Sequence, residues 1–141
     1  MCSVFLICHM SVPTKSKIRI FLIYWFPLIM YCLAIYIQSG FPGFKHIPEV
    51  RFFDKVLHFG AYGLLGILFY RAYETLPLSE NKNLLILLSI GSATLYGISD
   101  EIHQYFVPFR YADILDGMAN TIGSIFGVYF YDRWKAVKKP T

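Results

Sequence analysis

The 141-residue chain has few charged residues and none of the short motifs that mark many catalytic or nucleotide-binding proteins. Asp, Glu, Lys and Arg together make up only 16% of the sequence. It has no phosphate-binding glycine loop, no HExxH zinc motif, no CxxC pair and no nucleophilic serine elbow. A site built on any of these motifs is therefore excluded.

Cysteine is also scarce, with Cys2, Cys8 and Cys32 as its three occurrences. Cys32 falls within an apolar stretch, and the spacing fits neither a disulfide framework nor a zinc site. The sequence therefore indicates no redox chemistry, no structural metal and no cofactor.

Apolar residues are abundant: 56% of the chain is hydrophobic and 18% is aromatic. The mean hydropathy is +0.49, outside the range of soluble globular domains. The formal net charge is +4, but the basic residues flank apolar stretches instead of forming one solvated face. This composition predicts an integral membrane protein whose partners are membrane lipids, with no role in binding nucleic acid.

The first residues, "MCSVFLICHM", are apolar but have no basic region before them and no small-residue cleavage site after them. We therefore expect residues 1–14 to form a weakly ordered leader and not a signal peptide, and Met10 is a second possible start.

Four apolar stretches, 18–38, 56–73, 84–102 and 114–131, are separated by turn signals. A span of about 20 residues covers a hydrocarbon core of roughly 30 Å. We predict an all-α polytopic membrane protein, a four-transmembrane-helix bundle over residues 15–135, followed by a basic cytoplasmic tail at 136–141. Pro27 should bend the first span.

The distribution of Lys and Arg predicts the orientation, because cytoplasmic loops are enriched in these residues. With both termini cytoplasmic, that side holds nine: Lys15, Lys17, Arg19, Arg71, Lys82, Arg133, Lys135, Lys138 and Lys139. The other side holds four: Lys45, Arg51, Lys55 and Arg110. The expected topology is N-in and C-in, which brings the start of the second span and the loop before the fourth to the outer face.

The fourth span has one polar-to-small stripe. At 100° per residue, five side chains lie within an arc of about 80°: Asp113, Asp116, Asn120, Gly123 and Gly127. The acids and the amide can line a site, whereas the two glycines form a Gly-xxx-Gly seam for close helix packing.

The third span also has a polar side, formed by Ser92, Tyr96, Ser99, Asp100, His103 and Gln104. Glu101 points about 100° away from Asp100, so we expect it at the margin of any shared site. At the start of the second span, Asp54 and His58 are four residues apart and can form a hydrogen bond. Exposing these groups to lipid would cost about 3 kcal/mol per charge, so we predict that they line a polar pocket at the outer end of the bundle.

Each ionisable group also has a purely structural explanation. An acid at a helix start can be an N-cap, a histidine can be a hydrated interfacial residue, and an arginine can extend to lipid phosphate. These explanations apply to Asp54, His58, His103, Arg110, Asp113 and Asp116.

Four stretches resemble the VanZ-like family of small bacterial membrane proteins: "SGFPG", "DKVLHFGAYGLLG", "YGISDEIHQYFVPFR" and "DILDGMANTIGSIFG". The resemblance covers residues 18–132. Carried over, the family's polar signature falls on Asp54, Lys55, His58, Asp100, Glu101, Gln104, Arg110, Asp116 and Asn120. Phe109 stands where the family usually has glycine, so a turn requiring positive φ there would be strained.

The resemblance implies a protein of the bacterial cytoplasmic membrane that is linked to tolerance of teicoplanin-type antibiotics. The simplest hypothesis is a noncatalytic pocket for a lipid head group, cell-wall precursor or antibiotic-like ligand. Arg110, Lys55 and His58 would contact its phosphate or carboxylate, while Gln104 and Asn120 would fix its orientation.

The alternative is an intramembrane hydrolase or transferase acting on a lipid-linked phosphate or amide. His58 or His103 would be the general base, paired with Asp54 or Asp100, and Arg110 would stabilise the developing anion.

A metal-dependent version of this enzyme would use Asp100, Asp113 and Asp116 as Mg²⁺ ligands. A proton or ion transporter is a third possibility, because buried carboxylates can relay protons. Four short helices leave little room for alternating access unless the protein forms an oligomer.

Overall fold

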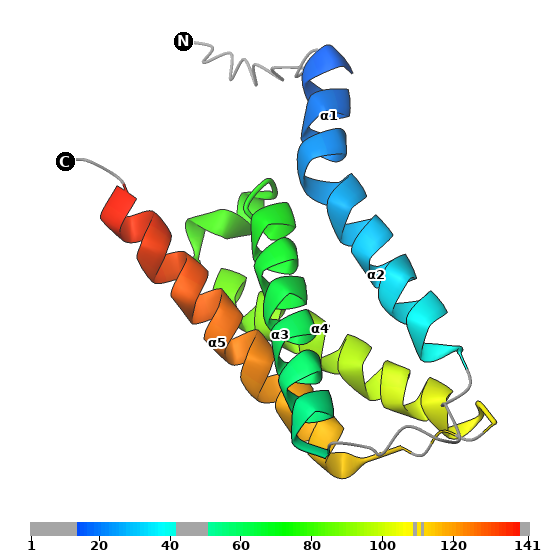
Figure 1. The fold of residues 1–141 in the computed structure, drawn as a ribbon. Helices are drawn as coiled ribbons and strands as arrows, with labels where there is room; N and C mark the ends of the chain where they lie inside the picture. The colour runs from blue at the N-terminus through cyan, green and yellow to red at the C-terminus, as the bar shows by residue number, and fades with distance from the viewer. Residues whose placement is uncertain (1–13, 42–50, 109, 111, 139–141) are drawn as a thin grey trace, which may run out of the picture.

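The computed structural model of the chain describes residues 14–41, 51–108, 110 and 112–138, and every element within them is helical. The first helix is continuous and consists of α1 (Thr14–Ile20), the π-helical turn η1 (Phe21–Trp25) and α2 (Phe26–Ser39). It is followed by α3 (Arg51–Tyr73), the short 3-10 helix η2 (Pro77–Glu80), α4 (Lys82–Tyr105) and α5 (Ile114–Lys138). The predicted all-α fold with four helices is confirmed (Figure 1).

Two of the four helices are long and apolar enough to cross a membrane, Ser16–Ser39 and Lys82–Tyr105, each of 24 residues. At 1.5 Å per residue, each reaches roughly 36 Å, more than the thickness of a hydrocarbon core. Although α3 and α5 are similarly long, at 23 and 25 residues, they contain more glycine and more charged residues. Most of the small and polar residues in the middle of α5 are buried against protein, so lipid does not contact them.

The helices extend beyond the predicted apolar stretches. α3 begins at Arg51, α4 ends at Tyr105, and α5 continues to Lys138. Backbone hydrogen bonds do not require apolar side chains, so a helix can continue through its charged ends. Hydropathy marks only the part of each helix that lipid can surround.

Pro27 lies two residues after the end of the π-helical turn of the first helix. Proline has no backbone N–H and cannot make the regular hydrogen bond to the preceding turn. The N–H of Phe26 instead reaches back five residues to the carbonyl oxygen of Phe21, which is the π-helical pattern. Figure 1 shows that the helix changes direction between α1 and α2.

α3 and α5 pack more closely than any side chain would allow at two positions. A Cβ atom on Gly123 would lie 2.2 Å from the carbonyl oxygen of Phe59, and one on Gly127 would lie 2.2 Å from that of Gly63. Small residues let two helix backbones approach in this way, which is the usual basis of helix association in membranes. This seam fixes the register of α5 on α3.

The first helix packs against α3 and α4 through a small apolar contact and hydrogen bonds. Leu28 is buried in the core cluster. The Tyr31 hydroxyl donates to the carbonyl oxygen of Ala61 at 3.1 Å, and the Tyr96 hydroxyl donates to that of Cys32 at 2.6 Å. These contacts hold α2 against α3 and α4.

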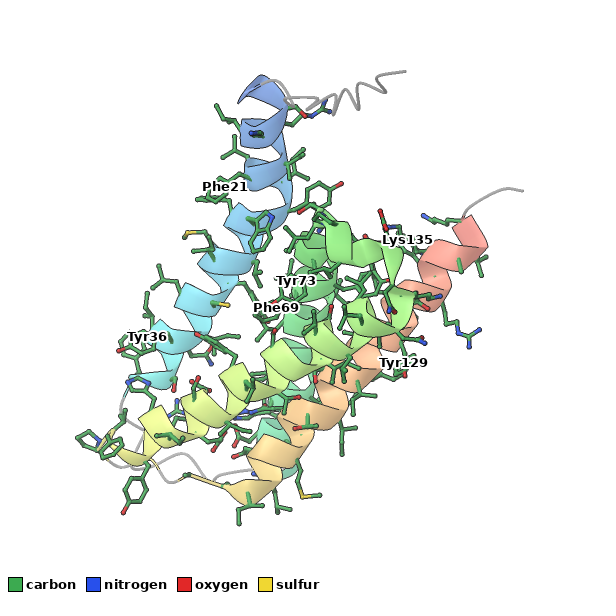
Figure 2. The ribbon with its side chains drawn as sticks, turned by 180° about the vertical axis from the view of Figure 1, so that it is seen from behind. Phe21, Tyr36, Phe69, Tyr73, Tyr129 and Lys135 are labelled. Atoms are coloured by element: carbon green, nitrogen blue, oxygen red, sulfur yellow. The ribbon has the colours of Figure 1, made fainter. Side chains whose placement is uncertain are left out.

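Aromatic side chains fill the space between the first helix and α3. The ring centroids of Trp25 and Tyr73 lie 6.2 Å apart, and those of Phe69 and Tyr73 lie 5.6 Å apart. Figure 2 labels Phe69 and Tyr73. The indole N–H of Trp25 donates to the hydroxyl of Thr75 at 3.1 Å. The aromatic contacts therefore lie near the end of α3, away from its polar start.

Figure 1 shows that α1 begins and α5 ends at the same end of the molecule. The last turn of α2, the start of α3, the end of α4 and the start of α5 lie at the other end. We call this second end the pocket end. Segments that are far apart in the sequence meet there, which is the arrangement that the candidate site requires.

Candidate functional site

Most of the polar side chains predicted from the sequence meet at the pocket end. They come from the start of α3, the end of α4, the following connection and the start of α5. We define the polar cluster as Asp54, Lys55, His58, Asp100, Glu101, Gln104, Arg110, Asp113, Asp116 and Asn120.

Lys55 of α3 bridges two carboxylates near the start of α5. Its ammonium lies 2.6 Å from Oδ2 of Asp113 and also donates to Oδ1 of Asp116. Asp113 directly precedes α5, and its Oδ1 accepts a hydrogen bond from the backbone N–H of Leu115 at 2.9 Å. Asp113 therefore has the capping role described for the acids at helix starts, and Lys55 is committed to two carboxylates.

His58 occupies the centre of the polar cluster. Its Nδ1 lies 3.0 Å from Oδ1 of Asn120, while its Nε2 lies 3.8 Å from Oδ1 of Asp54. The first distance is a hydrogen bond, whereas the second is too long for one, although Asp54 and His58 are within ion-pair distance of each other. An amide oxygen only accepts, so Nδ1 is the donor in this contact, and Nε2 is the ring nitrogen that faces Asp54.

Glu101 lies inside the polar cluster, contrary to the expectation that it would lie at the margin. Its side chain is buried, and Oε2 accepts a hydrogen bond from the backbone N–H of Asp113 at 3.1 Å. Oε1 lies 4.0 Å from Nδ1 of His58. α4 packs against both α3 and α5, so two consecutive positions, Asp100 and Glu101, can both be buried.

Asp100, Gln104 and Arg110 form a chain of hydrogen bonds along the end of α4. Gln104 donates from Nε2 to Oδ2 of Asp100 at 3.1 Å. Arg110 donates from Nη1 to Oε1 of Gln104 at 3.4 Å and from Nε to the carbonyl oxygen of Phe41 at 3.3 Å. Arg110 thereby connects the end of the first helix to α4.

Two predicted site residues, Tyr96 and His103, face the first helix and lie apart from the polar cluster. The His103 ring stacks on Tyr36 with centroids 4.6 Å apart, and its Nδ1 lies 3.4 Å from the hydroxyl of Ser39. Tyr96 bonds to the backbone of the first helix, as described above. These two residues anchor α2.

A pocket of about 190 Å³ opens between α2, α3 and α4 at the pocket end. Its wall is lined by Ile35, Gln38, Ser39, Asp54, Leu57, His58, Ala61, Tyr62, Asp100, Gln104 and Arg110. The hydroxyl of the buried Tyr62 lies beside the Asp100 carboxylate. The pocket therefore offers a cation, carboxylates, amides and a phenol within one small volume.

Most of the chain matches a known protein family. The VanZ/LLP1 family aligns with residues 5–135. The chain belongs to the VanZ/LLP1 family. This confirms the resemblance noted from the sequence and identifies a membrane protein with candidate transmembrane helices. No curated protein and no solved structure shows a significant match to the chain.

Membership of the VanZ/LLP1 family does not by itself identify side chains that could bind a metal ion. The sequence suggested Asp100, Asp113 and Asp116 as ligands, but both carboxylate oxygens of Asp113 are already engaged, one by Lys55 and one by the backbone N–H of Leu115. The structure instead brings together one possible donor atom each from Asp54, His58 and Asp116, all within 4.8 Å of one another. Phe109, where the family usually has glycine, is outside the described residues.

A second polar group of this VanZ/LLP1 chain was missed by the sequence analysis. At the end opposite the pocket, the buried Asp132 of α5 accepts a hydrogen bond from the Tyr70 hydroxyl at 2.9 Å and pairs with Lys82 at 3.0 Å. Nearby, Lys135 pairs with Glu74 (Figure 2 labels Lys135). These contacts join α3, α4 and α5 where the chain has many basic residues.

The spacing of buried residues along α5 is one sequence signal for the burial of Asp132. Asp132 lies four residues after Val128 and eight after Ser124, and both of these residues are buried. Side chains four apart share a helix face, so Asp132 continues a buried row. The burial of Asp132 was not predicted from the sequence, because the surrounding Lys and Arg residues indicated a solvated basic segment.

Proposed function

We propose that this VanZ/LLP1 membrane protein binds the head group of a membrane lipid or of a lipid-linked envelope molecule in the pocket between α2, α3 and α4. Binding there would change envelope properties and, with them, tolerance of envelope-directed antibiotics. The proposal concerns a binding protein, for which no chemical step is required.

The observation that carries the proposal is a pocket that presents both signs of charge beside helices able to cross a membrane. Arg110 lies on its wall together with Asp54 and Asp100. Its volume of about 190 Å³ is below the range of roughly 300–1,000 Å³ typical of drug-sized ligands. The pocket therefore suits a compact polar group whose hydrocarbon chains remain in the bilayer.

Arg110 is the main group for an anionic part of this ligand. Guanidinium has five N–H donors, of which Arg110 uses two for Gln104 and the backbone of Phe41. The remaining donors can form charge-assisted hydrogen bonds with phosphate or carboxylate. Lys55 was expected to share this task, but its pairing with Asp113 and Asp116 supports a structural role instead.

We also propose that the pocket faces the outer leaflet of the bacterial cytoplasmic membrane, with both chain ends in the cytoplasm. The excess of Lys and Arg supports this orientation. The start of α1 and the end of α5 lie together, opposite the pocket end (Figure 1), which is consistent with it.

Native mass spectrometry and lipidomics of the full-length protein, purified with its lipids, test the proposal directly. We expect one lipid species to copurify, and Arg110→Gln to reduce its occupancy about 10-fold, as loss of a charge-assisted hydrogen bond implies. Arg133→Gln is the matched control, because Arg133 is exposed at the opposite end. Equal occupancy in the Arg110→Gln variant and the control would contradict the proposal.

The environment of His58 supports a second candidate, a hydrolase or transferase acting on a lipid-linked phosphate or amide. Asn120 orients the ring, and Nε2 is directed towards Asp54 at 3.8 Å, on the wall of the pocket. A neutral imidazole with a free Nε2 is suited to act as a general base. The same lipidomics experiment separates the candidates, because an enzyme changes the copurifying lipid over time and His58→Ala stops that change.

A further inference from the structure

Three possible metal-ligand side chains lie close together beside the pocket. Asp54 and His58 lie one helical turn apart on α3, and Asp116 faces them from α5. Their donor atoms lie within 4.8 Å of one another. The separation of 3.8 Å between His58 Nε2 and Asp54 Oδ1 is too long for a hydrogen bond, but both atoms can contact one ion placed between them.

The orientation of His58 is typical of a metal ligand. A metal-binding histidine usually donates its other ring N–H to a carbonyl or carboxylate oxygen, which fixes the ring. Asn120 Oδ1 accepts from Nδ1 at 3.0 Å, and Asn120 is only 1% exposed. Nε2 is thereby the ring nitrogen on the side where Asp54 lies.

Two buried polar atoms beside His58 have no hydrogen-bond partner within the described residues. They are Oε1 of Glu101 and Nδ2 of Asn120, and Glu101 is only 9% exposed. Glu101 Oε1 lies 4.0 Å from His58. Leaving a buried carboxylate oxygen without a partner is costly, so the position of Glu101 indicates that a positive charge belongs in this neighbourhood.

The charges of the polar cluster also indicate that positive charge is missing there. Among the side chains that the structure describes there, the carboxylates are Asp54, Asp100, Glu101, Asp113 and Asp116, and the permanent cations are Lys55 and Arg110. A surplus of negative charge at the end of a membrane bundle is unfavourable unless it is paired. A dication would offset most of it.

We propose that Asp54, His58 and Asp116 bind a divalent cation. Two carboxylate oxygens with one imidazole nitrogen suit Mn²⁺ or Zn²⁺ better than Mg²⁺ or Ca²⁺, which favour oxygen ligands alone. Lys55 occupies Oδ1 of Asp116, so the second carboxylate oxygen of Asp116 is the one that the cation binds. Water molecules complete the coordination from the pocket side.

The cation site does not depend on head-group binding. It also has a consequence for that function, because Asp54 and His58 line the pocket and a cation held there would add a positive charge facing Arg110. An anionic head group could then be bound between the two.

The test uses the full-length protein in detergent, stripped of metal with EDTA and titrated with Mn²⁺ alone. Electron paramagnetic resonance counts bound Mn²⁺, and the imidazole nitrogen coupling in pulsed spectra reports a histidine ligand. We expect one Mn²⁺ per chain, at least about 10-fold weaker binding in Asp54→Asn, and no nitrogen coupling in His58→Gln. Asp132→Asn and His103→Gln are matched controls, because both residues lie outside the polar cluster. These two variants should bind Mn²⁺ as tightly as the unsubstituted protein does.

Unchanged Mn²⁺ affinity in Asp54→Asn, absence of nitrogen coupling in the unsubstituted protein, or an equal loss in Asp132→Asn would each overturn the proposal. The side chain of Asp54 is 54% exposed and makes no buried ion pair, so this variant should fold even if Asp116 variants do not. Because no lipid is added, failure of head-group binding would leave the Mn²⁺ titration unchanged, and the two proposals can fail separately.

Discussion

Gly127 of α5 lies so close to Gly63 of α3 that a Cβ atom at position 127 would be 2.2 Å from the Gly63 carbonyl oxygen. A backbone oxygen cannot move aside as the end of a flexible side chain can. The two helices must therefore separate before any larger residue fits at position 127. The start of α5, which carries the acids of the polar cluster, would move with the helix.

We expect Gly127→Ala and Gly123→Ala to destabilise the bundle by about 2 kcal/mol or more each, because added atoms overpack the seam. Gly117→Ala and Gly91→Ala are the controls, because a Cβ atom at either position meets nothing within 4 Å. Thermal unfolding in detergent would show the difference. Equal unfolding temperatures for the two pairs would contradict the close packing of α3 on α5.

We expect Lys55→Met to destabilise the protein by about 2 kcal/mol, because it leaves the buried Asp116 without its cation. Adding Asp116→Asn to Lys55→Met should restore part of the loss, since the unpaired charge is then removed. A double-mutant cycle at neutral pH measures this coupling.

The control is Lys135→Met, whose side chain is 41% exposed and pairs with Glu74. Exposed pairs contribute about 1 kcal/mol or less, so this variant should unfold almost as the unsubstituted protein does. A smaller effect of Lys55→Met than of Lys135→Met would refute the structural role assigned to Lys55.

If the protein confers the proposed antibiotic tolerance, we expect Asp100→Asn and His58→Ala to abolish that phenotype while the protein still accumulates in the membrane. Both residues line the pocket, so either change alters ligand contacts. Inhibitory concentrations and membrane immunoblots would be compared with Asp132→Asn, which alters a buried acid at the opposite end. If the pocket variants retain the phenotype, both the binding and the catalytic proposals lose their basis.

Topology can be tested with single cysteines in a variant whose three native cysteines are replaced by serine. We expect a membrane-impermeant maleimide to label Ala112→Cys in intact cells and to label Glu80→Cys only after lysis. Both positions are exposed, so accessibility differs only through the membrane. The reverse labelling pattern would place the pocket at the cytoplasmic face.

The helical periodicity was sufficient to place Asp116, Asn120, Gly123 and Gly127 on one face, because a regular helix repeats every 3.6 residues. All four are buried in the structure. The turn signals and apolar stretches were sufficient to predict four helices, and therefore that the start of α3 meets the end of α4. These features depend on local geometry alone.

The positions of Glu101, Lys55 and His103 could not be predicted in the same way, because they depend on how neighbouring helices pack. Glu101 is buried since α4 contacts two helices at once. Lys55 has two acids within reach, and His103 faces the first helix at an aromatic contact. No pattern within a single helix specifies which neighbour a side chain will contact.

The hydrogen bonds that hold the first helix have a consequence for how freely its sequence can vary. Tyr31 and Tyr96 donate to the carbonyl oxygens of Ala61 and Cys32, which are backbone atoms. Any residue that keeps the helix regular supplies the same acceptor. The first helix can therefore exchange its lipid-facing residues, and Cys32 itself, during evolution while the two tyrosines keep it attached to the bundle.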